Sequence, residues 1–271
     1  MLCGGCFFTV ETVEDVSLCL EMRHGSLAFN QKLPFRCRPD GPIPVFSKIS
    51  IAIHSGECLG LIGESGCGKT TLGRCLAGLQ KLSSGDVLFG GQPIGKIPRP
   101  LLCRRVQMIF QCPGDALNPL HSVRKILGEP LELHFSKLPK NRRTERIGEL
   151  LSAVHLPGEL LDRKSSALSG GQQQRVAIAR ALAVEPEFLI CDEVVSALDA
   201  ATREEVLECL SDLQRKYRLG VLFISHDLGM VRKFCTSAIA LIHGKLENIF
   251  PAHGAPFPCP GRVIEGGMGK I

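Results

Sequence analysis

The chain has 271 residues, a formal net charge of +5 and 44% hydrophobic residues, which fits a globular protein with one domain or a domain with a subdomain. No run of five like charges occurs, so a nucleic-acid-binding tail is not indicated. No apolar stretch reaches the ~18 residues that span a bilayer. The 13 cysteines are an odd number, and several lie in apolar patterns where reduced thiols act as small hydrophobes. We therefore expect a reducing, cytoplasmic compartment.

Apolar patterns predict strands at 14–20, 47–53, 57–62, 86–89, 106–110, 187–191, 221–224 and 238–242. Helices are predicted directly after Lys69, at 172–184 and at 202–216. Between about 122 and 168 the apolar residues follow helical spacing, as in Val123, Ile126 and Leu127. The sequence therefore predicts an α/β protein interrupted by a helical block. The Pro/Gly-rich tail at 251–271 is expected to be poorly ordered.

A glycine-rich segment between the strand at 57–62 and the following helix fits the phosphate-binding pattern of Gly, any four residues, then Gly-Lys-Ser/Thr. Its glycines let backbone N–H groups converge on an anion at a helix N-terminus. Lys69 would reach the terminal phosphates of a nucleoside triphosphate, and the Thr70 hydroxyl would ligate magnesium. The alternative is a plain glycine-rich turn. The candidate nucleotide-binding residues here are Gly63, Glu64, Ser65, Gly66, Cys67, Gly68, Lys69, Thr70 and Thr71.

A second candidate anion site opens the helix at 172–184 with the run Leu168-Ser-Gly-Gly-Gln-Gln-Gln-Arg175. With this run the chain resembles the ATP-binding-cassette (ABC) family, whose signature is Leu-Ser-Gly-Gly-Gln. The resemblance implies that two chains stack head to tail, with each ATP between the phosphate loop of one and the signature of the other. Alone, the same run would be a polar helix cap. The signature adds Ser169, Gly170, Gly171 and Gln172 to the nucleotide-binding residues.

The other motifs of the family appear in order. The resemblance implies that Asp192 holds magnesium and that Glu193 is the catalytic carboxylate that orients the attacking water. It implies a catalytic switch role for His226 at the γ-phosphate. Gln111 would contact both magnesium and water, and Asp199 would lie in a loop crossing the dimer interface. The implied cofactors are ATP and Mg²⁺, with Thr70, Gln111 and Asp192 as the metal residues.

The same resemblance implies a P-loop NTPase fold over 14–250. It comprises an ABC nucleotide-binding domain, an N-terminal antiparallel β subdomain and a helical subdomain at about 112–168. Two departures stand out. Val194 and Val195 replace the usual Pro-Thr, and by register the adenine-stacking position falls at about Leu20, which is not aromatic. Phe29 is then the candidate for stacking. Cys3 and Cys6 form a C-x-x-C pair without a second pair at zinc-finger spacing.

Within the family the chain resembles the ATPase subunits of peptide and nickel importers. Its implied partners are a second ABC ATPase subunit in a homo- or heterodimer, transmembrane permease subunits and, indirectly, a solute-binding protein. The implied location is the cytoplasmic face of the inner membrane, as a peripheral protein. We expect the exposed side of the helical block, from Leu117 to Val123, to dock a permease helix.

Two alternatives remain. One is an ABC ATPase of a soluble assembly, similar to the carbon–phosphorus lyase subunits. The other is a nucleic-acid-linked ABC ATPase, but such proteins carry long insertions or two cassettes. The segment between Lys69 and Ser169 is too short for such an insertion, so no nucleic-acid partner is expected.

Overall fold

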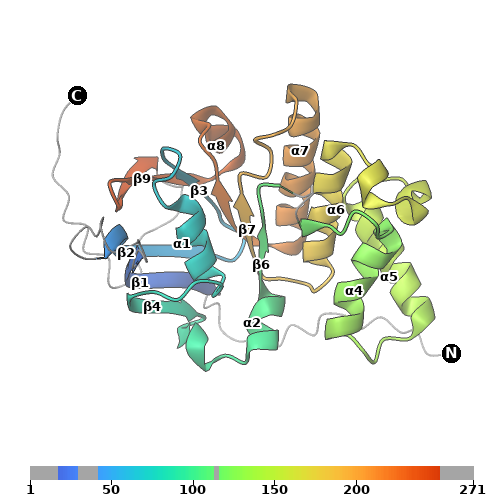
Figure 1. Cartoon of the computed structure of the whole chain (residues 1–271), viewed down its shortest axis with the longest axis horizontal. Helices are drawn as coiled ribbons and strands as arrows, with labels where there is room; N and C mark the ends of the chain where they lie inside the picture. Colours follow the sequence, from blue (N-terminus) through green and yellow to red (C-terminus); the bar gives the residue numbers. More distant parts are fainter. Residues whose placement is uncertain (1–17, 30–41, 113–115, 251–271) are drawn as a thin grey trace, which may run out of the picture.

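The protein is described by a computed structural model that covers residues 18–29, 42–112 and 116–250. It contains two sheets with helices around them (Figure 1). The C-x-x-C pair, the start of the predicted domain at 14–17 and the tail at 251–271 lie outside the described residues. Where the described helices are concerned, none has the length and apolar character needed to cross a membrane.

The smaller sheet is antiparallel and has the strand order β2-β1-β4-β5. Its strands are β1 (Cys19–Phe29), β2 (Ile43–His54), β4 (Ser84–Phe89) and β5 (Gln92–Pro93). The first strand was predicted at 14–20, and its predicted end is wrong, because the strand continues through a bulge with His24 at φ 49° to Phe29; residues 14–17 lie outside the described residues.

The larger sheet has the order β10-β9-β3-β8-β7-β6, and all of its pairings except β10 with β9 are parallel. Its strands are β3 (Cys58–Ile62), β6 (Val106–Ile109), β7 (Phe188–Asp192), β8 (Gly220–Ile224), β9 (Ser237–Ile242) and β10 (Lys245–Phe250). Every residue of β7 and β8 is buried, as expected for parallel strands covered on both faces.

The helices are α1 (Lys69–Leu76), α2 (Arg99–Arg105), α4 (Val123–His134), α5 (Lys140–Ala153), α6 (Gly170–Leu182), α7 (Ala200–Tyr217) and α8 (Leu228–Phe234). Short 3₁₀ segments lie at Ile94–Lys96, Gly158–Asp162 and Ser165–Ala167. The helices α4 and α5 pack against each other and against α6, on the side of the molecule away from the smaller sheet (Figure 1).

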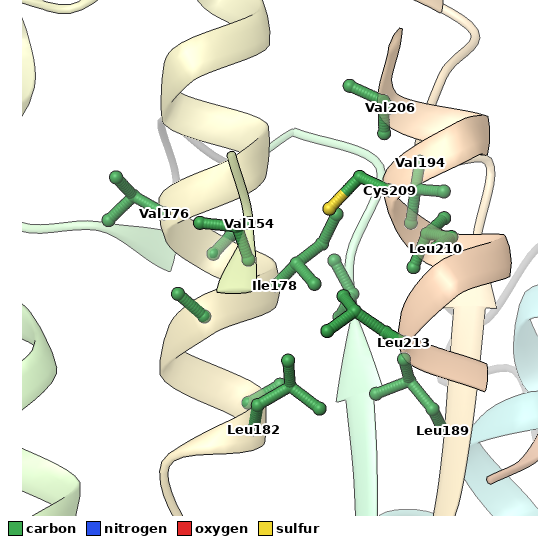
Figure 2. Packing of buried hydrophobic residues seen from close by; sticks show 14 of the residues in the cluster. Val154, Val176, Ile178, Leu182, Leu189, Val194, Val206, Cys209, Leu210 and Leu213 are labelled. Carbon is green, nitrogen blue, oxygen red and sulfur yellow. The ribbon is translucent and has the colours of Figure 1, made fainter. Parts of the chain in front are cut away.

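The core divides into two clusters because alternate side chains of β7 point to opposite faces of the larger sheet. Leu189 and Cys191 belong to the cluster formed with α4 to α7, whereas Phe188 and Ile190 belong to the cluster formed with α1 and the smaller sheet. Figure 2 shows part of the first cluster, in which Leu189 lies below Leu213 and side chains of α6 and α7 face each other. This packing fixes the carboxyl ends of β6, β7 and β8, where the candidate site lies.

Candidate nucleotide-binding site

The phosphate loop connects β3 to α1, and its conformation depends on glycine. Gly68 precedes α1 with φ 106°, and a Cβ atom there would lie 2.6 Å from Cγ1 of Val45. Neither the conformation nor the space suits another residue. No side chain caps the N-terminus of α1, so its first N–H groups are left for an anion, and the helix dipole favours negative charge there.

Lys69 is 5% exposed, and its ammonium donates to the carbonyl oxygens of Gly63 and Glu64, both at 2.8 Å. The side chain therefore folds back along the loop and holds it closed. Ser65 and Gly66 lie exposed at the tip of the loop, while Cys67 and Thr71 are partly buried. The loop is thus already folded in a shape that can bind an anion, with the Lys69 ammonium held at its base.

A buried carboxylate lies beside the loop. Asp192, at the end of β7, is 4% exposed, and its Oδ1 accepts a hydrogen bond from the Thr70 hydroxyl at 3.0 Å. Burial and the charge of Glu193 raise the pKa of Asp192, while Thr70, Arg74 and Lys69 act in the opposite direction. A carboxylate and a hydroxyl at this spacing are the hard oxygen donors that magnesium prefers, so the residues fit a magnesium ion.

Glu193 follows Asp192 directly and lies where three neighbouring strands end. Its Oε2 accepts from Nε2 of Gln111 at 3.2 Å and lies 3.5 Å from Nδ1 of His226. Gln111 follows β6, and His226 follows β8. The structure therefore brings together three residues that the sequence places far apart.

Ser196 also belongs to this group, although no individual role was predicted for it. Its hydroxyl donates to the carbonyl oxygen of Glu193 at 2.9 Å and lies 3.5 Å from Nε2 of Gln111. Glu193 itself has φ 48°, a left-handed conformation that is uncommon outside glycine. The Ser196 bond closes the turn that holds Glu193 in this conformation. The pattern of residue types carried no signal for this bond.

The signature forms a helix cap. The Ser169 hydroxyl accepts from the backbone N–H of Gln172 at 3.3 Å, and the Gln172 side chain accepts from the N–H of Ser169 at 3.1 Å. This is a capping box. Among the described residues, no hydrogen bond or ion pair joins the signature to the phosphate loop or to Asp192.

Asp199 caps α7 in a similar way. Its carboxylate accepts from the backbone N–H of Thr202 at 3.1 Å and from the Thr202 hydroxyl at 2.7 Å. The backbone N–H of Thr202 is the main reason that the pKa of Asp199 is lowered. Thr202 also contacts the signature helix, because a Cβ on Gly171 would lie 2.1 Å from its Cγ2 atom, whereas one on Gly170 would meet only Leu198, at 3.5 Å. Signature and interface loop are thus packed together.

Leu20, at the register position for adenine stacking, is fully buried, whereas the candidate Phe29 ends β1 and is 45% exposed. One expectation needs correction. In the proposed docking segment Leu117 and Val123 are buried at 3% and 0% exposure, because both face the core of the helical block. Asn118, Pro119 and Leu120 are exposed, and Leu120 is the exposed large hydrophobic residue of the segment, at 74%.

The fold and these motifs together define a P-loop nucleotide-binding cassette. Residues 46–196 match the ABC transporter family, to which the chain therefore belongs. The chain is 46% identical over 205 residues to the nickel import ATP-binding protein NikE of Brucella suis, covering 74% of this chain and 77% of that protein. It is 43% identical over 218 residues to the oligopeptide transport ATP-binding protein OppF of Bacillus subtilis, covering 79% and 72% respectively.

A solved structure supports the same assignment. The chain resembles the ATP-binding cassette MJ0796, solved as a dimer bound to ADP and Pi, with a TM-score of 0.72 and 26% identity over 85% of this chain and 98% of that one. The protein is therefore an ATP-binding and ATP-hydrolysing ABC cassette that uses magnesium. Family membership also implies a partner ATPase, permease subunits and a peripheral place at a membrane.

Proposed function

We propose that this chain is the ATPase subunit of an importer for peptides, nickel or metal chelates, at the cytoplasmic face of the inner membrane. The names of its relatives, which concern nickel import and oligopeptide transport, support this substrate range. A solute-binding protein would take part indirectly, and the chain would pair with a second ABC ATPase, either identical or different.

The observation that carries the proposal is the separation of two phosphate-binding helix ends. The uncapped N-terminus of α1 lies beside Lys69 and Asp192, whereas Ser169 at the start of α6 is bonded, among the described residues, within its own helix end. One chain therefore offers two incomplete half-sites. A head-to-tail pair would complete them, with the nucleotide between the phosphate loop of one chain and Ser169, Gly170 and Gly171 of the other.

In the completed site Lys69 and the N–H groups of the loop would hold the triphosphate, while Thr70, Asp192 and Gln111 would hold magnesium, which supplies charge neutralisation. Glu193 would accept a hydrogen bond from the attacking water and orient it. His226 would contact the γ-phosphate while remaining close to Glu193. Phe29 would stack on the base.

The test is Glu193→Gln, which removes the carboxylate charge at the attacking water but keeps the residue's shape. Purified E193Q protein should bind ATP and accumulate as an ATP-bound dimer, detected by size-exclusion chromatography with light scattering. Wild-type protein with ADP is the control and should remain monomeric. An E193Q protein that stays monomeric in saturating ATP would contradict the two-chain site.

Co-purification from the native host distinguishes the importer from the alternative, an ABC ATPase of a soluble assembly. Membrane permease subunits in the complex support the importer, whereas a soluble enzyme complex supports the alternative. Uptake of radioactive nickel or of labelled peptides by cells with and without the gene then distinguishes the substrate classes.

A further inference from the structure

Glu185, three residues beyond the end of α6, has an unusual backbone conformation. Its φ is 55°, in the left-handed region, and its N–H donates to the carbonyl oxygen of Leu182 at 3.0 Å. Glycine is the usual residue at such a position after a helix, because a side chain is strained there. A glutamate in this conformation therefore requires an explanation from its side chain.

The carboxylate of Glu185 lies between two arginines from different helices. Its Oε2 is 3.4 Å from Arg104 of α2, and its Oε1 is 3.4 Å from Arg146 of α5. All three side chains are partly exposed, and single exposed ion pairs contribute little to stability. We therefore explain the shared carboxylate by its effect on position: it joins α2 and α5 to the segment that follows α6.

Arg104 extends the junction to two more segments. Its Nε donates to the carbonyl oxygen of Val184 at 3.1 Å, and its guanidinium lies 4.5 Å from the ring centroid of Phe135. Phe135 directly follows α4 and packs against the larger core cluster. Arg104 of α2 thus contacts the segments that follow α4 and α6. Glu185 links this group to α5 through its ion pair with Arg146.

The junction lies at the opposite end of α6 from the signature. This helix has 13 residues, so about 20 Å separates its two ends. Because a helix of this length moves as a rigid unit, a displacement at Glu185 changes where Ser169 is presented. The element α2 leads directly into β6, and Gln111 follows β6 two residues after its end. The junction therefore connects the phosphate-loop core to the helical block and to the signature.

We infer that Glu185 is a positioning residue which, through Arg104 and Arg146, sets the orientation of α6 and the helical block for ATP-dependent pairing of two chains. It acts on the reaction only through the signature helix. The inference rests on the two-chain site proposed above.

The decisive substitution is Glu185→Gly, made in the E193Q background. Glycine relieves the left-handed backbone strain and removes the carboxylate, so the melting temperature should stay equal or rise. Binding of a fluorescent ATP analogue to the monomer should not change. ATP-dependent dimerisation should weaken by between about two- and thirtyfold, the range expected when coupling residues are changed. Stability and function should thus move in different directions, which a merely structural role does not produce.

Arg218→Gly is the matched control. Arg218 directly follows α7 and has φ 50°, and its side chain makes no ion pair among the described residues. This change should keep the melting temperature equal or higher and leave dimerisation unchanged. A second variant, Glu185→Gln, keeps the side-chain length without the charge and should weaken dimerisation less than E185G.

The outcomes separate the two claims. If E193Q itself fails to dimerise, the two-chain site is wrong and the inference falls with it. If E193Q dimerises and E193Q/E185G dimerises equally well, only the role of Glu185 is wrong. Equal loss of dimerisation in the R218G control would also overturn that role, because the effect would then come from the backbone change alone.

Discussion

The Thr70 hydroxyl donates a hydrogen bond to Oδ1 of Asp192 at 3.0 Å, and this bond joins the first turn of α1 to the end of β7. It links the phosphate loop directly to a buried carboxylate. Burial raises the pKa of this carboxyl group, which is the arrangement expected of a group that binds a positive ion.

The first prediction concerns Asp192→Asn in protein without magnesium or nucleotide. Removing a buried charge while keeping the oxygen that accepts from Thr70 should raise the melting temperature by roughly 2–4 °C. Magnesium-ATP should then stabilise D192N much less than it stabilises the wild type. Differential scanning fluorimetry with and without magnesium-ATP measures both effects, and an unchanged response of D192N would exclude Asp192 as a metal residue.

The pH dependence of this difference follows from the raised pKa of Asp192. The folded protein holds its proton more tightly than the unfolded chain, so wild-type stability falls as pH rises through the window between the two pKa values. The advantage of D192N should therefore be full above the folded pKa and disappear towards the ordinary Asp value near 3.8. Melting curves between pH 4 and 8 should show the two proteins converging at the acidic end.

The second prediction is that Lys69→Ala weakens ATP binding by about tenfold or more and abolishes hydrolysis, because the terminal phosphates lose their cation. The same change leaves two loop carbonyls without their donor. Cys67→Ser is the control within the same loop and should remain active. Equilibrium binding of a fluorescent ATP analogue and phosphate release provide the measurements, and wild-type affinity in K69A would refute the assignment.

The third prediction uses the packing of the signature against α7. Gly171→Ala places a methyl group into Thr202, whose hydroxyl is held by Asp199, so it should destabilise the fold by about 1–3 kcal/mol. Gly170→Ala should be tolerated much better, because its methyl group would make only an ordinary van der Waals contact with Leu198. Chemical denaturation quantifies the difference.

Adding Thr202→Ser to G171A provides a rescue, since serine lacks Cγ2 but keeps the hydroxyl that bonds Asp199. The double variant should recover most of the stability lost in G171A. Failure of this rescue would mean that the clash with Thr202 is not the cause.

The fourth prediction concerns Leu120, the exposed large hydrophobic residue of the proposed docking segment. Leu120→Asp should remove stimulation of ATP hydrolysis by the cognate permeases in reconstituted vesicles and leave the basal rate unchanged. Leu133→Asp is the control and should retain stimulation, because Leu133 is also exposed, at 78%, but lies on α4 outside the docking segment. Equal loss of basal and stimulated rates in L120D would show that the residue is merely structural.

The sequence determined the chemistry of this protein because each phosphate-binding helix end is formed by residues that are close together in the chain. The phosphate loop needs only a strand, glycines, Lys69 and Thr70 in succession, and the backbone then creates the anion site by itself. The helix beginning at Ser169 is equally local, since a capping box is formed by residues three apart. The apolar runs at β7 and β8 also predicted strands, and every residue of both strands is buried, as expected where a strand is covered on both faces.

The tertiary structure alone decided how distant groups meet. Gln111, Glu193 and His226 are neighbours because β6, β7 and β8 are adjacent in the sheet, and that order is set by the packing of helices on its two faces. The extent of β1 depended on a bulge, and the burial of Val123 depended on which face of α4 meets the core. The bridge from Glu185 to Arg104 and Arg146 joins segments far apart in the chain, so no local pattern could predict it. Local pattern specifies which groups are present, whereas their mutual distances follow from the burial of apolar surface across the whole chain.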